Sequence, residues 1–575
     1  MAELALNDSR RLTGPNLLSD SPGAVIDVAF GGPYAERVVA AWREYARTIL
    51  DAVGWSKEEL YNHTFAGGAS LLLSAPVDAL YAATEINEWA WEATVAALAG
   101  ESEPDVDTGA GRLRDVIAAE RNPRLLALRR AARQRGLRFL SDDDLASIGS
   151  GSGSMTWPVD SLPDPDDVPW HEAHDVPVAL VTGSNGKTTT VRLIAAMARA
   201  AGGTPGYSST DGIFVGAETV DEDDWSGPGG ARIVLRDTRV ETAILETARG
   251  GMLRRGLGVE RAEAAAVTNV SADHLGEYGV DSVADIANAK LVVRRALGAS
   301  GVLVVNADDA TLAERAAAVR SPITWFGLDP KAPRLKSHLE SGGDASILED
   351  GALVIAVGGR RERIAAVSDV PLTFSGAARY NIANVLAAVP LARALGIPLD
   401  AIRSALAAFG GRSAINPGRG NLFELGGVRA LVDFAHNPHG MRALAELVTA
   451  LPAERRLLVL GQAGDRDDAS IRELVQEALE IPLDRILIKE MTKYLRGRAE
   501  GEVPALIEEA LREAGVPGER VRRAEDEIDA LRQALDWSRP GDLLILPVHA
   551  QREEVLDMLE RLSSAAWSPG EKLPP

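Results

Sequence analysis

Cysteine is absent from the 575-residue sequence, which excludes disulfide bonds, zinc–thiolate centres and a thiol nucleophile. Basic residues are in deficit, because 61 Lys and Arg stand against 83 Asp and Glu, giving a net charge of −22. A nucleic-acid-binding surface needs a basic footprint. We therefore expect no nucleic-acid partner, and we interpret the acidity as an aid to solubility.

Long apolar runs are also missing. No uninterrupted apolar stretch approaches the ~20 residues that cross a bilayer, and the opening residues Met1–Asp8 lack a basic region followed by an apolar run. We expect no membrane partner, no signal peptide and a cytoplasmic location.

The length is too great for one core and predicts about three or four domains. A homo-oligomer is left open.

The first part of the chain has helical periodicity in residues 35–53, 76–98 and 123–135. It predicts an α+β N-terminal domain over residues 1–150. The aromatic and acidic stretch 81–91 is interpreted as a helix that packs its tryptophans on a core rather than as a ligand site. Glycine and serine alternate from Gly149 to Ser154 and prolines follow, so residues 151–175 have the composition of a linker.

The remainder of the chain has an α/β pattern. From Val176 onward, short β-branched runs alternate with helical stretches, which is typical of parallel βαβ units. A central domain with a parallel sheet flanked by helices is predicted over residues 176–415, and a Rossmann-like α/β domain over residues 416–575. The expected strands are 178–181, 242–245, 265–268, 429–432, 456–460, 485–488 and 542–546.

The strongest motif lies between the first of these strands and a helix. It reads Gly183-Ser184-Asn185-Gly186-Lys187-Thr188-Thr189-Thr190. Glycines let the backbone N–H groups point inward at phosphate oxygens, and the helix N-terminus adds a favourable dipole. Lys187 is expected to reach the β- and γ-phosphates and the Thr188 hydroxyl to ligate Mg²⁺. The alternative is a turn that merely opens a helix. Gly-Lys-Thr directly after a buried strand favours ATP, bound by Gly183, Asn185, Gly186, Lys187, Thr188 and Thr189.

Further polar residues follow predicted strands. Glu246 ends one strand, His274 closes the segment Asn269–His274 after another, and Lys290 lies in a helical stretch. A carboxylate and an imidazole at strand ends suit a Mg²⁺ site beside a nucleotide. Taken singly, Glu246 could cap a helix, His274 could be a hydrogen-bonded polar residue and Lys290 a solvated helix residue.

The phosphate loop resembles that of the Mur ligase superfamily, which reads Gly-Thr-Asn-Gly-Lys-Thr-Thr. In that family a strand-end Glu and the His of Asn-x-x-x-Asp-His bind Mg²⁺, and a Lys of the following helix is often carbamoylated. The resemblance therefore implies a metal site of Thr188, Glu246, His274 and Lys290. It implies catalytic roles for Lys187, Glu246, His274 and Lys290.

Later motifs extend the resemblance. Asn381 and Asn384 match the family's adenine-side segment, although Tyr380 stands where the family has His. Pro417-Gly418-Arg419 and Asp433-Phe434-Ala435-His436-Asn437-Pro438 match Pro-Gly-Arg and Asp-Tyr-Ala-His-Asn-Pro. These matches imply that Arg419 meets the phosphates and Asp433 the ribose region. The residues implied at the substrate are Thr210, Asp211, Arg249, His436 and Asn437.

Segments 209–213, 245–258 and 268–276 are more similar to the C-terminal ligase half of the cyanophycin synthetase family than to the murein enzymes. Leu12–Asn16 resembles that family's opening residues. Where the family has an ATP-grasp domain, this chain passes through the predicted linker directly to the phosphate loop. The resemblance thus implies a relative that has one of the family's two ligase domains.

The activity implied is ATP-dependent ligation with Mg²⁺. A carboxylate attacks the γ-phosphate to give an acyl phosphate, and an amine then displaces phosphate to form an amide or isopeptide bond. The expected partners are amino acids or peptides, with an Asp- or Glu-like acid. A non-catalytic, ATP-binding regulatory or scaffold paralogue of cyanophycin synthetase is the alternative. A plain ATPase or kinase would leave the later motifs unexplained.

Overall fold

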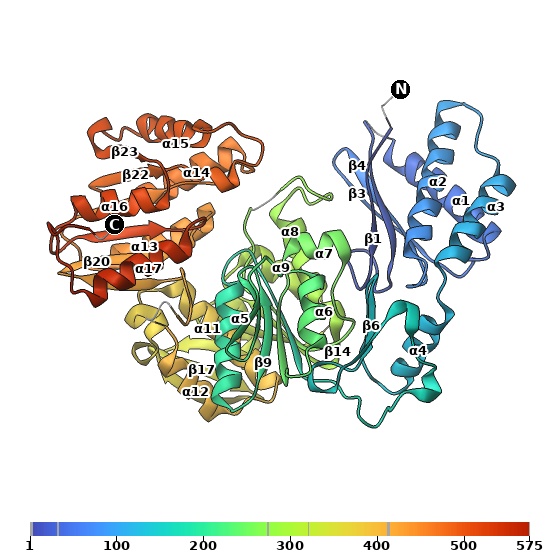
Figure 1. Ribbon diagram of the computed structural model, residues 1–575, viewed down its shortest axis with the longest axis horizontal. Helices are drawn as coiled ribbons and strands as arrows, with labels where there is room; N and C mark the ends of the chain where they lie inside the picture. The colour runs from blue at the N-terminus through green and yellow to red at the C-terminus, as the bar shows by residue number, and fades with distance from the viewer. Residues whose placement is uncertain (1–3, 32–33, 273–274, 320, 411–413, 574–575) are drawn as a thin grey trace. The chain divides into compact units, whose positions relative to one another are not determined.

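The computed structural model describes residues 4–31, 34–272, 275–319, 321–410 and 414–573. The chain forms two compact units, each coloured by residue number in Figure 1. Unit 1 comprises Met1–Ser346, Ile355–Arg360 and Ala387–Ile402, and unit 2 comprises Ile347–Val354, Arg361–Leu386 and Arg403–Pro575. The expected division into an N-terminal domain, linker, central domain and C-terminal domain stays a prediction.

Unit 1 begins with an antiparallel four-stranded sheet of order β1-β2-β4-β3. Its strands are β1 (Ala5–Leu12), β2 (Gly23–Ala29), β3 (Leu60–Phe65) and β4 (Gly68–Ser74). Three helices accompany the sheet: α1 (Ala35–Ala52), α2 (Leu80–Ala99) and α3 (Val106–Glu120). The predicted helices are confirmed, with α2 starting at Leu80 rather than at residue 76.

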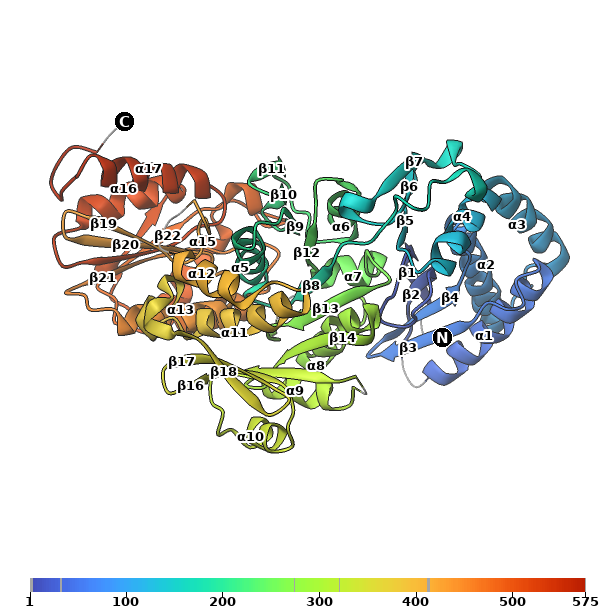
Figure 2. The ribbon, with the colours of Figure 1, turned by 90° about the horizontal axis from the view of Figure 1, so that it is seen from below.

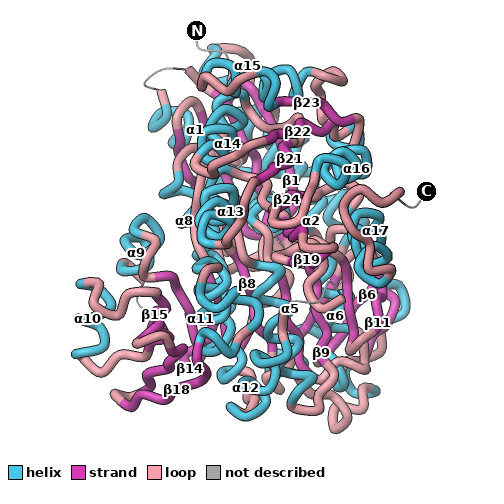
Figure 3. Tube along the Cα trace, turned by 90° about the vertical axis from the view of Figure 1, so that its left-hand side faces the viewer, coloured by secondary structure: helices cyan, strands magenta, loops and turns pink. Residues whose placement is uncertain are grey.

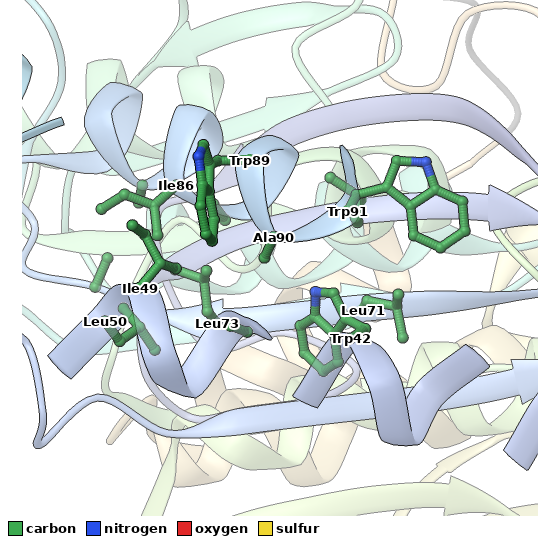
Figure 4. Close-up of a cluster of buried hydrophobic side chains, with 14 of the residues drawn as sticks. Trp42, Ile49, Leu50, Leu71, Leu73, Ile86, Trp89, Ala90 and Trp91 are labelled. Atoms are coloured by element: carbon green, nitrogen blue, oxygen red, sulfur yellow. The ribbon is translucent and has the colours of Figure 1, made fainter. Parts of the chain in front are cut away.

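Trp42 of α1 and Trp89 and Trp91 of α2 belong to one buried hydrophobic cluster with Leu71 and Leu73 of β4, as Figure 4 shows. Trp42, Trp89 and Trp91 are at most 5% exposed, and each contributes roughly 1.5–3 kcal/mol or more by leaving water. The indole N–H of Trp42 donates to Asn87 Oδ1 at 2.9 Å, so the buried amide is satisfied. The tryptophans of stretch 81–91 therefore belong to a core, as the sequence predicted.

A small three-stranded sheet comes next, in the order β5-β6-β7. Its elements are α4 (Pro123–Gln134), β5 (Phe139–Ser141), β6 (Leu145–Ile148) and β7 (Met155–Pro158). The Gly/Ser stretch lies between β6 and β7 and is packed, since Ser152 N–H donates to Val240 O at 2.7 Å. A Cβ on Gly151 (φ +56°) would lie 2.3 Å from that same oxygen. The glycines of this stretch permit close backbone packing.

The largest sheet has the order β11-β10-β9-β12-β8-β13-β14-β15-β16-β17-β18. Its strands are β8 (Val178–Thr182), β9 (Pro205–Ser209), β10 (Gly212–Val215), β11 (Glu218–Asp221), β12 (Thr242–Glu246), β13 (Ala262–Val267), β14 (Leu297–Asn306), β15 (Ile323–Gly327), β16 (Ala345–Glu349), β17 (Ala352–Val357) and β18 (Arg360–Ala366). The run from β9 to β15 is parallel, and Figure 2 labels β9, β12, β8, β13 and β14 in this order.

Helices follow the parallel strands. They are α5 (Lys187–Ala200), α6 (Pro228–Arg236), α7 (Arg249–Arg255), α8 (Val283–Lys290), α9 (Ala310–Ala317), α10 (Pro333–Glu340), α11 (Arg379–Ala394) and α12 (Leu399–Ala408). Strand β8 is buried along its whole length, and Glu246 at the end of β12 pairs in register with Val181 of β8. The residues that follow β8, β12 and β13 therefore meet at one edge of the sheet.

Unit 2 contains a six-stranded sheet of order β19-β20-β24-β21-β22-β23. Its elements are β19 (Asn421–Leu425), β20 (Val428–Asp433), α13 (Pro438–Ala450), β21 (Arg456–Leu460), α14 (Asp468–Leu479), β22 (Arg485–Lys489), α15 (Glu502–Glu513), β23 (Val521–Ala524), α16 (Glu527–Trp537), β24 (Leu543–Pro547) and α17 (Arg552–Ser564). Only β19 is antiparallel to its neighbour.

Two hydrophobic cores cover the two faces of this sheet. Side chains of α13, α14 and α15 form one core, and side chains of α16 and α17 form the other; the helices and strands are distinguished in Figure 3. This is the doubly wound arrangement. The predicted α/β fold class and all seven predicted strands are confirmed. Over the described residues, no helix is long and apolar enough to span a membrane.

Candidate active site

The phosphate loop connects β8 to the first turn of α5. Gly183 has φ +152°, and a Cβ there would lie 1.8 Å from Thr268 Oγ1, so the loop cannot accept a side chain at this point. Gly186 has φ +85° and immediately precedes α5. Two glycines in conformations that other residues rarely adopt let the loop curl at the helix N-terminus, where an anion is stabilised.

Residues after β13 hold the loop in this shape. Asn269 accepts from Asn185 N–H through Oδ1 at 2.9 Å and donates through Nδ2 to Asn185 O at 3.1 Å. Thr268 Oγ1 also donates to Asn185 O at 2.6 Å. The loop is thus fixed by side chains of a neighbouring strand end. Thr268 was not among the predicted site residues, and Asn269 was recognised only as part of a motif.

Glu246 and Thr188 form the centre of the site. Glu246 is 2% exposed, and its Oε2 accepts from Thr188 Oγ1 at 2.8 Å. Lys187 Nζ lies 4.0 Å from Glu246 Oε1, and Thr210 Oγ1 lies 3.2 Å from Thr188 Oγ1. A buried carboxylate beside two hydroxyls provides the hard oxygen ligands that Mg²⁺ prefers. The sequence-predicted Lys187, Thr188, Thr210 and Glu246 are therefore together.

Of the two other residues predicted to bind the metal, His274 and Lys290, the structure describes only Lys290. His274 lies outside the described residues. Lys290 is the last residue of α8 and is 4% exposed, which differs from a solvated helix lysine. No group of three or more His, Asp and Glu side chains is arranged to hold a metal within the described part of the chain. Their roles at the metal, and the carbamoylation of Lys290, stay predictions.

Asp211 and Arg249 are both engaged by charged partners. Asp211 Oδ2 pairs with Arg192 Nη2 at 3.0 Å, and both side chains are 6% exposed. Arg192 was not predicted, although it follows Thr188 by four residues and so shares its face of α5. Arg249, at the start of α7, pairs with Glu277 at 2.5 Å. The ion pair with Arg192 orients Asp211, which follows β9.

The segment that carries Glu277 is held by the N-terminal sheet. Arg10 of β1 lies over the Tyr278 ring, 4.4 Å from its centroid, and its Nε donates to Leu253 O of α7 at 3.1 Å. Gly279 has φ +70°, and a Cβ there would lie 2.3 Å from Phe65 Cδ1 of β3. The N-terminal sheet thus contacts both α7 and the 275–280 segment.

A second group of predicted residues gathers in unit 2. Tyr380 Oη donates to Asp433 Oδ2 at 3.4 Å. Asn381 Nδ2 donates to Leu372 O at 3.0 Å, and Asn384 Nδ2 donates to Asn381 Oδ1 at 3.1 Å. Burial raises the pKa of Asp433 to about 6, against the opposing effects of Arg419 and of hydrogen bonds. Burial likewise raises the pKa of Tyr380 well above its ordinary value, and the Asp433 carboxylate adds to the shift.

Phe434 organises the motif that follows β20. The Arg419 guanidinium lies 4.7 Å from the Phe434 ring centroid, and the His436 ring lies 5.2 Å from it. Asn437 accepts from Gly440 N–H at 2.8 Å and so caps α13. Arg419, Asp433, His436 and Asn437 are therefore brought together, with Asn437 used as a helix cap.

A buried charged cluster adjoins this motif. Lys489 Nζ donates to Glu527 Oε1 at 2.5 Å, to Pro547 O at 2.6 Å and to His549 Nδ1 at 3.1 Å. An ammonium group only donates, so His549 Nδ1 accepts and its Nε2–H faces Ala435 O at 3.3 Å. Although burial opposes it, the charge of Lys489 lowers the pKa of Glu527 to about 2. Glu527 and His549 were not predicted, because they carry no local motif.

Comparison with known proteins identifies two matching segments of the chain. Residues 181–392 match the Mur ligase middle domain, and residues 418–547 match the Mur ligase glutamate ligase domain. These two segments are Mur ligase domains.

Several proteins are similar over these Mur ligase domains. Cyanophycin synthetase from Trichormus variabilis is 38% identical over 378 residues, 66% of this chain and 42% of that protein. Cyanophycin synthetase from Synechocystis sp. is 39% identical over 371 residues, 64% of this chain and 42% of that protein. The chain thus spans less than half the length of these two relatives.

More distant similarity reaches the murein enzymes. The UDP-N-acetylmuramoyl-L-alanyl-D-glutamate–2,6-diaminopimelate ligase of Chlorobaculum tepidum is 28% identical over 384 residues, 64% of this chain and 70% of that protein. Among solved structures, E. coli FolC in complex with DHPP and ADP has a TM-score of 0.48 and 20% identity, covering 68% of this chain and 89% of that chain. The resemblance to the Mur ligase superfamily and to cyanophycin synthetase is confirmed.

Proposed function

We propose that this chain is an ATP-dependent ligase that joins a carboxylate to an amine and releases ADP and phosphate. The observation that carries the proposal is the cluster of Lys187, Thr188 and buried Glu246 at the end of a parallel sheet. It lies within a Mur ligase middle domain that is followed by a Mur ligase glutamate ligase domain. The similar proteins include enzymes named as synthetase and ligase.

The phosphate loop binds and orients the nucleotide. Backbone N–H groups at the N-terminus of α5 would face the phosphates, and the Lys187 ammonium would offset the negative charge on the transferring group. Thr188 and Glu246 would hold Mg²⁺, with His274 and Lys290 as the further proposed ligands; the metal would neutralise phosphate charge. Positioning and electrostatics thus supply most of the rate.

Two displacements complete the proposed reaction. An oxygen of the substrate carboxylate attacks the γ-phosphorus, and the bond from that phosphorus to the β-phosphate bridging oxygen breaks, releasing ADP. The amine nitrogen then attacks the acyl carbon, the bond from carbon to the phosphate oxygen breaks, and phosphate leaves as the nitrogen loses a proton. We propose an Asp- or Glu-like acid, free or in a peptide, and an amino acid's α-amine.

The remaining sequence-predicted residues are proposed to bind the rest of the nucleotide and the substrate. Asn381 and Asn384 are assigned to the adenine side, Arg419 to the phosphates and Asp433 to the ribose region. The burial of Asn381 and Asn384 and their mutual hydrogen bond support a rigid wall. Thr210, Asp211, Arg249, His436 and Asn437 are assigned to the substrate, with Asp211 oriented by Arg192.

The decisive experiment measures ADP release with pairs of amino acids and dipeptides, followed by mass spectrometry of the product. Ligation requires ADP release that depends on both a carboxylate and an amine. ADP release without either substrate would indicate a plain ATPase. ATP binding without ADP release under any pair would favour a regulatory or scaffold protein over the proposed ligase.

A further inference from the structure

A cavity of about 460 Å³ opens in unit 1 beside the segment that ends at Val280. Its walls come from the N-terminal sheet through His63, from α8 through Asn288, and from α9 through Arg315. The turn after α8, Leu291–Ala296, contributes Arg294 and Arg295. We call this cavity the arginine pocket after Arg294, Arg295 and Arg315.

Positive charge in the arginine pocket is only partly balanced. Arg295 pairs with Asp20 at 2.5 Å, but that carboxylate is 74% exposed, and such pairs contribute little. Asp285, the carboxylate in the wall, is occupied in the capping box of α8 with Ser282. Neither Arg294 nor Arg315 has a carboxylate partner among the residues that the structure describes. This is unexpected in a chain of net charge −22.

Arg294 and Arg295 also repel each other. Partial burial lowers the pKa of Arg294, and the neighbouring Arg295 guanidinium lowers it further, with only Asp20 opposing. An anion in the pocket would relieve this repulsion and could form two parallel hydrogen bonds with the planar guanidinium group. The charge pattern therefore favours an oxyanion ligand.

The remaining walls favour a peptide over a bare inorganic anion. Leu17, Leu18, Leu291, Val292 and Val319 provide apolar surface between the arginines. A phosphate ion is too small to use this surface, whereas the methylene groups of aspartate side chains can contact it. The volume lies within the range of sites for small organic ligands.

The residues that line the arginine pocket do not include Lys187, Thr188 or Glu246 of the phosphate-binding centre. Asn288 of α8 lines the pocket and is exposed, whereas Lys290 is buried. At 3.6 residues per turn, these two side chains point about 160° apart, on nearly opposite sides of the helix. A ligand in the pocket would instead contact Gly279 and Val280, next to the Glu277 that pairs with Arg249.

We propose that the arginine pocket binds a short acidic peptide, with carboxylates on Arg294 and Arg315 and methylene groups on the apolar wall. In so far as this names the acceptor of the ligation, it rests on the function proposed above. The peptide would be anchored away from the reacting carboxylate and would hold the 275–280 segment in place.

Calorimetric titration without ATP tests the pocket independently of activity. Tri-aspartate, tri-asparagine and inorganic phosphate are the three probes. Tri-aspartate should bind, and raising salt from 50 to 200 mM should weaken it. Arg294→Met and Arg315→Met should each weaken binding at least about 5-fold. Arg522→Met, which removes an exposed arginine of β23, should leave it unchanged.

Three results would overturn the proposal: no binding of tri-aspartate, equal binding of tri-asparagine, or binding that both pocket variants retain. Phosphate that binds more tightly than tri-aspartate would also overturn the peptide assignment. ADP release is measured on the same proteins. Wild-type protein that binds tri-aspartate through the arginines but never releases ADP would contradict the ligase and still support the pocket.

Discussion

Lys187 is the residue whose removal most directly tests the phosphate loop. Its ammonium group lies beside Glu246, where it would offset charge on the transferring phosphate. Lys187→Ala should lower ADP release at least ~100-fold, the usual effect of removing one group that stabilises a transition state. The side chain is not part of a core, so the circular dichroism spectrum should not change.

Lys336→Ala is the matched control for Lys187→Ala, because Lys336 is 61% exposed and forms only a helix-surface pair with Glu340. It should retain full ADP release. Normal turnover in Lys187→Ala would remove the loop from the proposed site.

The buried carboxylate of Asp433 lowers the stability of the folded state at neutral pH. Its pKa is raised from 3.8 to about 6 by burial, so the folded state binds this proton more tightly than the unfolded state. Stability is therefore lost as pH rises from about 4 to about 6. At pH 7.5 the ionised group destabilises the fold by up to ~3 kcal/mol.

Asp433→Asn should accordingly raise the urea midpoint at pH 7.5 while ADP release falls. The gain should vanish near pH 4, where the wild-type carboxyl is protonated. A variant equally destabilised at both pH values would show that the carboxylate is structurally required. Tyr380 can still donate to the amide oxygen that this substitution introduces, so the substitution removes the charge and keeps the hydrogen bond.

At the scale of elements, the Lys489 cluster ties the end of β22 to the start of α16 and to the loop after β24. Glu527 accepts from Lys489 and from the N–H groups of His549, Ala550 and Gln551. Lys489→Met leaves a buried carboxylate without its cation, which typically costs ~3–5 kcal/mol. The urea midpoint should fall strongly.

A second substitution distinguishes the cost of an unpaired buried charge from the cost of lost packing. Glu527→Gln added to Lys489→Met should recover part of the stability, because the neutral amide oxygen still accepts from the N–H groups of Ala550 and Gln551. Lys493→Met removes a lysine four residues away that is exposed and should have little effect. A double variant as unstable as Lys489→Met alone would contradict the charge argument.

The contact of β3 with the 275–280 segment predicts a steric effect. A methyl group on Gly279 would overlap Phe65, whereas Gly276, with φ +85°, has open space around it. Gly279→Ala should therefore reduce ADP release much more than Gly276→Ala, about 10-fold or more for an ~1 Å misplacement near the substrate. Both variants carry similar backbone strain, so the difference between their ADP release rates measures the effect of the overlap with Phe65.

Phe65→Ala combined with Gly279→Ala supplies the complementary measurement. Removing the ring should restore part of the activity, since the overlap is gone and only the strain of a positive φ remains. Equal losses in the Gly276 and Gly279 variants would show that the N-terminal sheet does not position this segment.

For the whole molecule, the proposed ligase site predicts one bond type per turnover. The cyanophycin synthetases are more than twice as long as the matched region, which covers 42% of their length. We expect this chain to add a single amino acid to each acceptor carboxylate rather than to extend a polymer. Incubation with ATP, Mg²⁺, Asp and Arg, with and without a short Asp-containing primer, gives products that mass spectrometry can count. Growth beyond one residue per carboxylate would contradict this.

Features built from consecutive residues were predictable from the sequence. Phosphate binding needs a strand, a tight turn and a helix in succession, so Gly183–Thr190 predicted its own local structure and, as a prediction that stands, a phosphate ligand. Buried parallel strands are apolar on both faces and appear as short apolar runs, which is why β8, β12 and β20 were predicted. Composition alone did not show that Gly149–Ser154 is packed, because it cannot distinguish a flexible glycine from one that permits close packing.

Only the tertiary structure decided which distant residues meet. Parallel strands place their carboxyl ends at one edge, which brings Glu246 to Thr188 and His549 to Lys489, 58 and 60 residues away in the chain. These surroundings then determine the chemistry of the side chains, because burial raises the pKa of Asp433 and the contact with Lys489 sets the proton position on His549. Neither the partner nor the desolvation of a side chain is contained in its local sequence. The residue types came from the sequence alone, and their pairing and ionisation came from the fold.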